Sequence, residues 1–222
     1  MKASSWKLLP SSWVPSEGQM EFDRKLFKSF QDGDPPILRF FYFKKPTLTL
    51  GRLEARRSDL ARFTYPHEIR PTGGRAVLHG EGDLCYAVIA SSRDERVGGD
   101  LMASYQKISG LLQKAFQNLG REVELSAAPH RSQGLAHCFS APSQCELTLG
   151  GKKVAGGAQA REKNHFLQQG VILLSVSPDW QKAFPESGTD SMVGLNDISG
   201  TAPVTRAGLE KALLQSFESV EA

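Results

Sequence analysis

The sequence has no long hydrophobic run. Nowhere do about 18 apolar residues follow one another, the length at which a run becomes a candidate membrane-spanning helix. The opening stretch, MKASSWKLLPSSWVP, is too polar and too interrupted by proline to provide the apolar segment of a signal peptide. We therefore expect a cytoplasmic protein.

Motifs of nucleotide-binding proteins are also missing. The chain contains neither a Walker loop nor a GxGxxG between a strand and a helix. The histidines at 67, 79, 137 and 165 are as easily explained as ordinary polar residues as they are by acid-base chemistry. No class of cofactor-dependent enzyme is indicated by these patterns.

Cysteine is scarce, and its spacing does not suggest a metal site. Cys85, Cys138 and Cys145 cannot all pair, and a reducing compartment would keep them as thiols. Cys138 and Cys145 are too far apart for a CxxC pair, and the nearby histidines do not complete a ligand set. We expect no metal.

Strong charge of either sign is absent. The formal net charge is +3 and the pI is about 8.8, without a long run of Lys or Arg. Nucleic-acid binding usually requires a clustered basic face, whereas a mild basic excess fits an acidic protein partner. We expect protein partners and no nucleic acid or membrane.

What is present describes an ordinary folded domain. The 222 residues are 40% hydrophobic and 23% charged, enough for one core without disulfides. Apolar periodicity and turn residues predict helices and strands along the whole chain. The expected elements are a helix over 17–30, a hairpin from 35–43 and 46–52, a strand at 84–90, a helix over 100–119, a strand at 121–125, a hairpin around Gly150 and Gly151, a strand at 165–174 and a helix from Thr205.

Strands in hairpins with a few helices between them favour an α+β fold, a mixed and largely antiparallel sheet flanked by helices, over a βαβ array. We expect residues 1–222 to form a single domain and a monomer. Residues 178–205 have the weakest pattern, and they either cover a site or lie on the surface.

The segment RPTGGRAVLHGEGDLCYAVI, residues 70–89, is a candidate binding loop. A Thr-Gly-Gly-Arg turn before a strand brings backbone amides close to Arg70 and Arg75, with His79 at the end of the strand. Such a turn can hold a carboxylate, a phosphate or an acyl chain. A tight hairpin corner with surface arginines explains the same residues, and the pattern leaves both open.

Cys138 is the best candidate nucleophile among the three thiols. It lies between the loop-like stretches RSQGLAH and SAPS, whereas Cys85 is inside an apolar strand and Cys145 opens one. A cation beside a thiol favours the reactive thiolate, and Lys152 and Lys153 are the nearest candidates in sequence. Adjacent strand residues point to opposite faces, so one of these lysines can face a cleft. An inert cysteine and solvated lysines remain the alternative.

Several segments together resemble the biotin and lipoate protein ligase superfamily. RPTGGRAVLH followed by GDLCYAVI is similar to the RRxTGGRAVLH turn and strand of lipoate-protein ligase A and its relatives, and GGKKVAGGAQAREKNHFLQQGVILL is similar to their GxKxxGxAQ…xLQHGxxLL block. GQMEFDRKLF and FKKPTLTLGR resemble two earlier blocks in the same order. HCFSAPSQCEL resembles the xCFxxPSxxEL stretch of cysteine-dependent octanoyltransferases.

The resemblance implies a catalytic domain that attaches an octanoyl or lipoyl group to a lysine of an acceptor domain. It makes Cys138 the residue that forms an acyl thioester and Lys153 the contact to the acyl carbonyl. The chain has Gln169 where the family block has histidine. The substrate-binding residues that the resemblance implies are Arg70, Thr72, Gly73, Gly74, Arg75, His79, Gly156 and Ala158.

The implied reaction is octanoyl or lipoyl transfer from acyl carrier protein, or from a lipoyl domain, without a cofactor. One alternative is an ATP- and Mg-dependent lipoate-protein ligase that acts through lipoyl-adenylate and has no need of Cys138. Another is a non-catalytic module that binds lipoyl domains. Many ligases carry a C-terminal accessory domain, and we expect none here.

Overall fold

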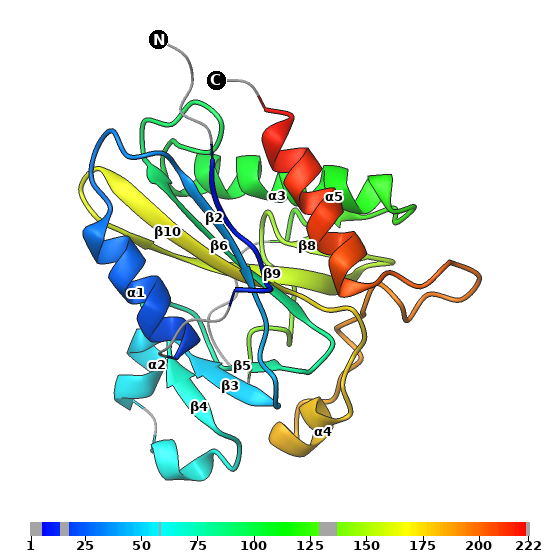
Figure 1. The fold of residues 1–222 in the computed structure, drawn as a ribbon. Helices are drawn as coiled ribbons and strands as arrows, with labels where there is room; N and C mark the ends of the chain where they lie inside the picture. Colours follow the sequence, from blue (N-terminus) through cyan, green and yellow to red (C-terminus); the bar gives the residue numbers. More distant parts are fainter. Residues whose placement is uncertain (1–5, 14–17, 58, 129–136, 221–222) are drawn as a thin grey trace.

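The computed structural model describes residues 6–13, 18–57, 59–128 and 137–220. Its main feature is a seven-stranded mixed sheet in the order β1-β2-β6-β10-β9-β8-β7, antiparallel except where β1 runs parallel to β2 (Figure 1). The strands of this sheet are β1 (Lys7–Leu9), β2 (Ile37–Phe41), β6 (Leu84–Ser91), β7 (Glu124–Leu125), β8 (Leu147–Leu149), β9 (Lys152–Arg161) and β10 (His165–Ile172). The predicted α+β class is confirmed.

A second, three-stranded sheet corrects one prediction. β3 (Thr47–Leu50) pairs with β4 (His67–Ile69) and with β5 (Val77–His79), and not with β2. The hairpin predicted from 35–43 and 46–52 is therefore wrong. All residues of β2 and β3 are buried, so each strand needs cover on both of its faces. β2 is covered as part of the seven-stranded sheet, and β3 as part of the three-stranded sheet. Local sequence identifies strands better than it identifies their partners.

Helices and the small sheet cover the two faces of the large sheet (Figure 1). Helices α3 (Leu101–Asn118) and α5 (Arg206–Glu218) pack on one face, while α1 (Gln19–Ser29) and the small sheet lie on the other. In β6, Tyr86 and Val88 point to the helical side and Cys85 and Ala87 to the opposite side. The apolar run at 84–90 is therefore a central strand covered on both faces, as predicted.

The predicted helix ends are confirmed by their hydrogen bonds. The Asp100 side chain accepts from the Ala103 amide at 2.8 Å at the start of α3, and Thr205 accepts from the Gly208 amide at 3.1 Å at the start of α5. Such caps satisfy amides that lack partners within the helix. Gly120 follows α3 with a φ of 70°, suited to a helix C-terminus. The predicted helix over 17–30 is α1, and residue 17 lies outside the described residues.

Segment 178–205 packs against the core. It contains α4 (Asp179–Ala183), whose Trp180 is buried, and the isolated bridge between Met192 and Lys153 of β9. The remaining short helices are α2 (Arg52–Arg57) and the 3-10 helix η1 (Leu60–Arg62). The strand predicted at 121–125 is reduced to the two residues of β7. Across the described ranges, no helix is long and apolar enough to cross a membrane.

Candidate active site

The hairpin of β8 and β9 places Lys153 inside the protein. Gly150 and Gly151 have φ angles of 58° and 76°, the left-handed conformation that a tight two-residue turn requires. The register shifts by one residue between Leu147 and Thr148, a bulge of the kind found next to active sites. Lys152 is exposed and Lys153 is 1% exposed, so the prediction that the two lysines point to opposite faces is confirmed.

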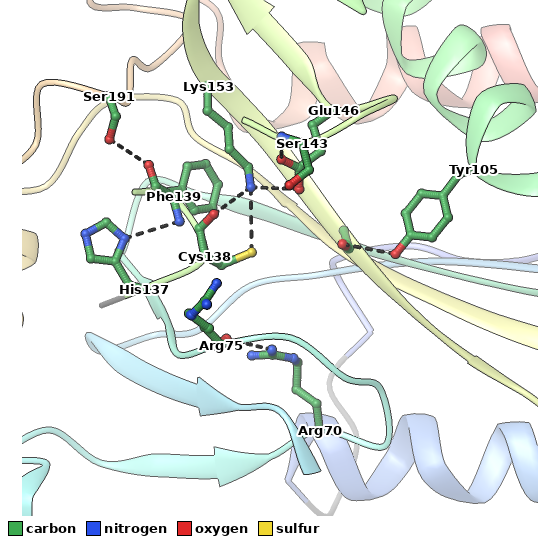
Figure 2. Close-up of polar contacts among 11 residues, drawn as sticks. Arg70, Arg75, Tyr105, His137, Cys138, Phe139, Ser143, Glu146, Lys153 and Ser191 are labelled. Carbon is green, nitrogen blue, oxygen red and sulfur yellow. Dashed lines mark hydrogen bonds and ion pairs between the residues drawn. The ribbon is translucent and has the colours of Figure 1, made fainter. Parts of the chain in front are cut away.

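The Lys153 ammonium group has three partners (Figure 2). Its Nζ donates to the Cys138 carbonyl oxygen at 2.7 Å and to Glu146 Oε1 at 2.7 Å, and it lies 3.6 Å from Cys138 Sγ. Burial lowers the pKa of Lys153, but the neighbouring Cys138 and Glu146 outweigh burial and hold that pKa above its ordinary value. Lys153 is therefore a fixed cation beside the thiol.

Glu146 is a site residue that the sequence analysis missed. It is 9% exposed, and its Oε2 accepts from the Ser143 amide at 2.7 Å while its Oε1 accepts from Lys153. A signal for this pairing was available. In a hairpin turning at Gly150 and Gly151, Thr148 lies opposite Lys153, and residue 146 shares the face of residue 148.

Cys138 is half-buried at a turn that is held from three sides. Its amide donates to the Ala76 carbonyl at 3.0 Å, just before β5. The Phe139 amide donates to His137 Nδ1 at 3.2 Å, and Ser191 Oγ donates to the Phe139 carbonyl at 2.7 Å (Figure 2). The preceding loop expected at 131–136 lies outside the described residues. The described contacts orient the thiol toward Lys153.

Gly156 allows the Lys153 side chain to lie across β9. A Cβ atom added at Gly156 would lie 2.6 Å from Lys153 Cε and 2.9 Å from its Nζ. Both distances are shorter than carbon and nitrogen atoms tolerate, so any larger residue must displace the lysine. Gly156, predicted as part of the substrate site, thus contributes space for the catalytic candidate itself.

A pocket opens beside Cys138, between the two sheets. Its wall is largely apolar, and four of the predicted substrate-binding residues belong to it. The described lining residues are Met20, Phe41, Thr49, Arg70, Val77, His79, Cys138, Phe139, Gly156, Gly157, Ala158, Gln169, Gly170 and Val171. An apolar pocket with few polar groups suits a hydrocarbon chain attached at the thiol end.

Arg70 holds the predicted binding loop in place. Its guanidinium donates to the Thr49 carbonyl at 2.6 Å, to the Gly73 carbonyl at 2.9 Å and to the Arg75 carbonyl at 2.8 Å. Gly74, with a φ of 88°, makes the turn between them. Arg70 therefore organises the loop through hydrogen bonds to its carbonyl groups, and the loop closes over the β9 side of the pocket.

His79 and Gln169 form the polar part of the pocket. His79 Nε2 lies 2.8 Å from Thr49 Oγ1, and burial together with Arg70 lowers the pKa of His79 to about 3, so the ring is neutral. Gln169 accepts from Thr72 Oγ1 at 3.0 Å and donates to Asp23 Oδ2 at 2.6 Å. Gln169 thus links the predicted loop to helix α1, a role that the sequence analysis did not assign to it.

The structure therefore brings the predicted residues together at one place. The pocket is lined by Cys138, Arg70, His79, Gly156 and Ala158. The Nζ of Lys153 lies 3.6 Å from the Cys138 Sγ. The loop residues Thr72, Gly73, Gly74 and Arg75 are not among the described lining residues. These loop residues lie at the border of the pocket, where hydrogen bonds to Arg70 and Gln169 hold the loop.

Comparison with known proteins identifies the family to which this arrangement belongs. Residues 16–218 match the lipoyl protein ligase A/B catalytic domain. The chain belongs to this family. Both Cys138 and Lys153 lie within the residues that match the lipoyl protein ligase A/B catalytic domain.

Two curated relatives of this catalytic domain are octanoyltransferases. The protein named octanoyltransferase LipM of Carboxydothermus hydrogenoformans is 34% identical over 181 residues, covering 79% of this chain and 67% of its own. Octanoyltransferase LipM of Kyrpidia tusciae is 30% identical over 237 residues, covering 96% of this chain and 86% of its own. The octanoyltransferase resemblance predicted from HCFSAPSQCEL agrees with these names.

Solved structures share the fold of this lipoyl protein ligase A/B catalytic domain. Lipoate-protein ligase A bound with ATP has a TM-score of 0.75 at 23% identity, covering 98% of this chain and 84% of that chain. A bipartite lipoate protein ligase from Thermoplasma acidophilum has a TM-score of 0.70 at 24% identity, covering 98% and 83%. At these identities the likeness concerns the fold.

Proposed function

We propose that this chain is an acyltransferase of protein lipoylation, which moves an octanoyl group through a thioester on Cys138 to a lysine of a lipoyl-domain acceptor. The observation that carries the proposal is the Lys153 Nζ placed 3.6 Å from Cys138 Sγ, at the mouth of an apolar pocket. The curated relatives named octanoyltransferase LipM support the same activity.

The first step loads the enzyme. The Cys138 sulfur attacks the carbonyl carbon of an octanoyl thioester on acyl carrier protein, and a new carbon–sulfur bond forms as the carrier's bond breaks. The carrier leaves as a thiol with the proton that Cys138 gave up. Two N–H groups of Lys153 are held by Glu146 and the Cys138 carbonyl, which leaves the third to stabilise the oxygen of the tetrahedral intermediate.

The second step transfers the acyl group to the acceptor. The neutral amine of the acceptor lysine attacks the Cys138 thioester, an amide bond forms, and the carbon–sulfur bond breaks. The amine proton returns to the Cys138 sulfur. Thioester exchange is nearly isoenergetic and amide formation from a thioester is downhill, so the proposed cycle uses no ATP and no metal.

Intact-protein mass spectrometry tests this proposal. The protein is mixed with octanoyl-acyl carrier protein without ATP, and a gain of one octanoyl group that hydroxylamine removes is expected. Cys138→Ala should abolish the adduct, whereas Cys145→Ala, the matched half-buried thiol, should keep it. If the protein stays unmodified, and it lipoylates an acceptor only when free lipoate and ATP are supplied, the ligase function would replace the transferase function.

Partners and location follow from the same cycle. The substrates of the proposed cycle are the octanoyl group, its carrier protein and the lipoyl-domain acceptor. The three cysteines are free thiols in the structure, and a cysteine that must stay reduced to accept an acyl group suits the cytoplasm. The proposal therefore places the reaction in that compartment.

A further inference from the structure

A second, open groove lies outside the active-site pocket, lined by residues of α1, of α2 and of the end of β9. Among its described lining residues, five carry a positive charge and only Glu162 carries a negative one. The whole chain has a formal charge of just +3. The positive charge is thus concentrated at this groove.

Much of this charge is available to a partner. In the described part of the chain, no hydrogen bond or ion pair occupies the side chains of Lys28, Arg52 or Arg56, which are all exposed. Arg24 and Arg161 also line the groove but are held by protein atoms, Arg24 by the Ile69 carbonyl at 2.9 Å and Arg161 by the Gly99 carbonyl.

Exposed apolar side chains accompany these charges. Ile69, in the groove, is 39% exposed, and Leu53, which follows Arg52 on α2 but is not among the described lining residues, is 50% exposed. Large apolar side chains among unpaired charges of one sign are typical of a surface that binds a protein of opposite charge. A partner with acidic residues around a small apolar patch would satisfy both features.

The distance between the groove and the active-site pocket discriminates between the two protein substrates, the carrier protein and the acceptor domain. Ala158 lines the active-site pocket and Ala160 the groove, on the same face of β9. From Gly156, next to Lys153, to Ala160 is four strand residues, about 13 Å at about 3.3 Å each. A lysine that projects from the part of a partner seated in the groove, with a stem of four carbons, is too short for that span. The prosthetic arm that bears the thioester on a carrier protein is much longer.

We propose that this basic groove is the docking surface for the acidic acyl carrier protein that donates the octanoyl group. The inference rests on the proposed function, because it assigns the donor of that reaction to a surface. Lys28, Arg52 and Arg56 attract the acidic partner, Ile69 and Leu53 contact its apolar patch, and the arm reaches over the loop at Gly74 to Cys138.

A pair of charge-reversed variants tests the surface. The test variant is Arg52→Glu/Arg56→Glu, and the control is Lys114→Glu/Lys211→Glu, whose exposed lysines lie on α3 and α5 across the large sheet. Binding of fluorescently labelled carrier protein is measured by anisotropy at two salt concentrations. Transfer is measured with octanoyl-carrier protein and with octanoyl-pantetheine, a neutral donor without a protein.

The groove variant should bind the carrier at least tenfold more weakly, lose most of the salt dependence and show a raised KM for the carrier donor. Transfer from octanoyl-pantetheine should match wild type, as should the control variant with both donors. Unchanged carrier binding in the groove variant, absent binding in wild type, or a KM increase for the acceptor alone would each overturn the docking site. Absent acylation of Cys138 from both donors would instead overturn the proposed function, while the binding data would still decide the docking site.

Discussion

Lys153 and Glu146 form a buried ion pair in which one member faces the thiol. Removing one partner of such a pair leaves an uncompensated charge inside the protein, whereas replacing both by apolar residues is often tolerated. Stability and catalysis can therefore be separated at this pair.

Lys153→Met should lower the transfer rate by roughly 10²–10³-fold, because the donor to the oxyanion is lost. It should also lower the free energy of unfolding by about 3–5 kcal/mol, since Glu146 stays buried without its partner. The double variant Lys153→Met/Glu146→Leu should recover most of the stability, measured by urea unfolding, and none of the activity. Full transfer by either variant would exclude Lys153 from catalysis.

Gly156→Ala should cut transfer by at least tenfold and also lower the free energy of unfolding. The added methyl group would lie 2.6 Å from Lys153 Cε and 3.4 Å from Glu146 Oε1, so it displaces the lysine from Cys138 and disturbs the buried ion pair with Glu146. Gly110→Ala is the matched control, because nothing lies within 4 Å of a Cβ there. That variant, in the interior of α3, should keep full activity and gain up to about 1 kcal/mol of stability. Equal activity in both variants would contradict the placement of the Lys153 side chain.

At the scale of elements, the β8–β9 hairpin sets the position of the catalytic lysine. Its turn has positive φ at both central residues, and β9 then runs past the pocket, the loop at Gly74 and the groove. One strand thus connects the thiol, the acyl pocket and the proposed docking surface. The turn residues Gly150 and Gly151 determine where β9 begins.

Gly151→Val should destabilise the protein by about 1–2 kcal/mol and reduce transfer, since a β-branched residue resists a φ of 76°. Gly150→Asn creates Asn-Gly, the preferred pair for such a turn, and should leave both properties near wild type. Thermal unfolding and transfer rates measure the two effects. A neutral Gly151→Val would show that the turn does not determine the register of the hairpin.

The helices and strands also show which features could be predicted from the sequence and which could not. The pattern of apolar residues identified α3, α5, β6 and β10, and the start of α5 at Thr205, because these signals depend on residues within one turn or one strand. The pairing of β3 was mispredicted, since hairpin signals do not reveal that β4 and β5 compete for the same strand. Among site residues, Cys138 and Lys153 could be proposed from motifs, whereas Glu146 was missed although the turn at Gly150 and Gly151 places it on the face of Thr148, opposite Lys153.

For the whole molecule, burial of polar groups between the two sheets makes stability depend on pH. Burial and Arg70 lower the pKa of His79 to about 3, and burial with Lys153 lowers the pKa of His137 to about 4. Both rings are neutral in the folded state and take up protons on unfolding below about 6.5. Their contribution is present above that pH and is lost as the pH falls toward the folded-state values.

His79→Gln should remove part of this pH dependence. Between pH 7 and pH 5 the wild type should lose about 2 kcal/mol more of its free energy of unfolding than the variant, at about 1.4 kcal/mol per pKa unit. Asp83, whose pKa burial raises to about 7, acts in the opposite direction equally in both proteins. The exposed His67→Gln should behave as wild type in urea titrations, and identical slopes for all three would disprove the burial effect.

The sequence by itself determined the three long helices α1, α3 and α5, most of the strands, the family and the two residues proposed for thioester chemistry. Each of these depends on local periodicity, turn residues or motifs that lie within a few tens of residues. Tertiary structure decided which strands pair, that Glu146 holds Lys153, that Gln169 joins the loop to α1, and that basic residues of α1 and α2 share one groove. These features bring distant segments together, and their energies come from burial and charge pairing that no local pattern contains.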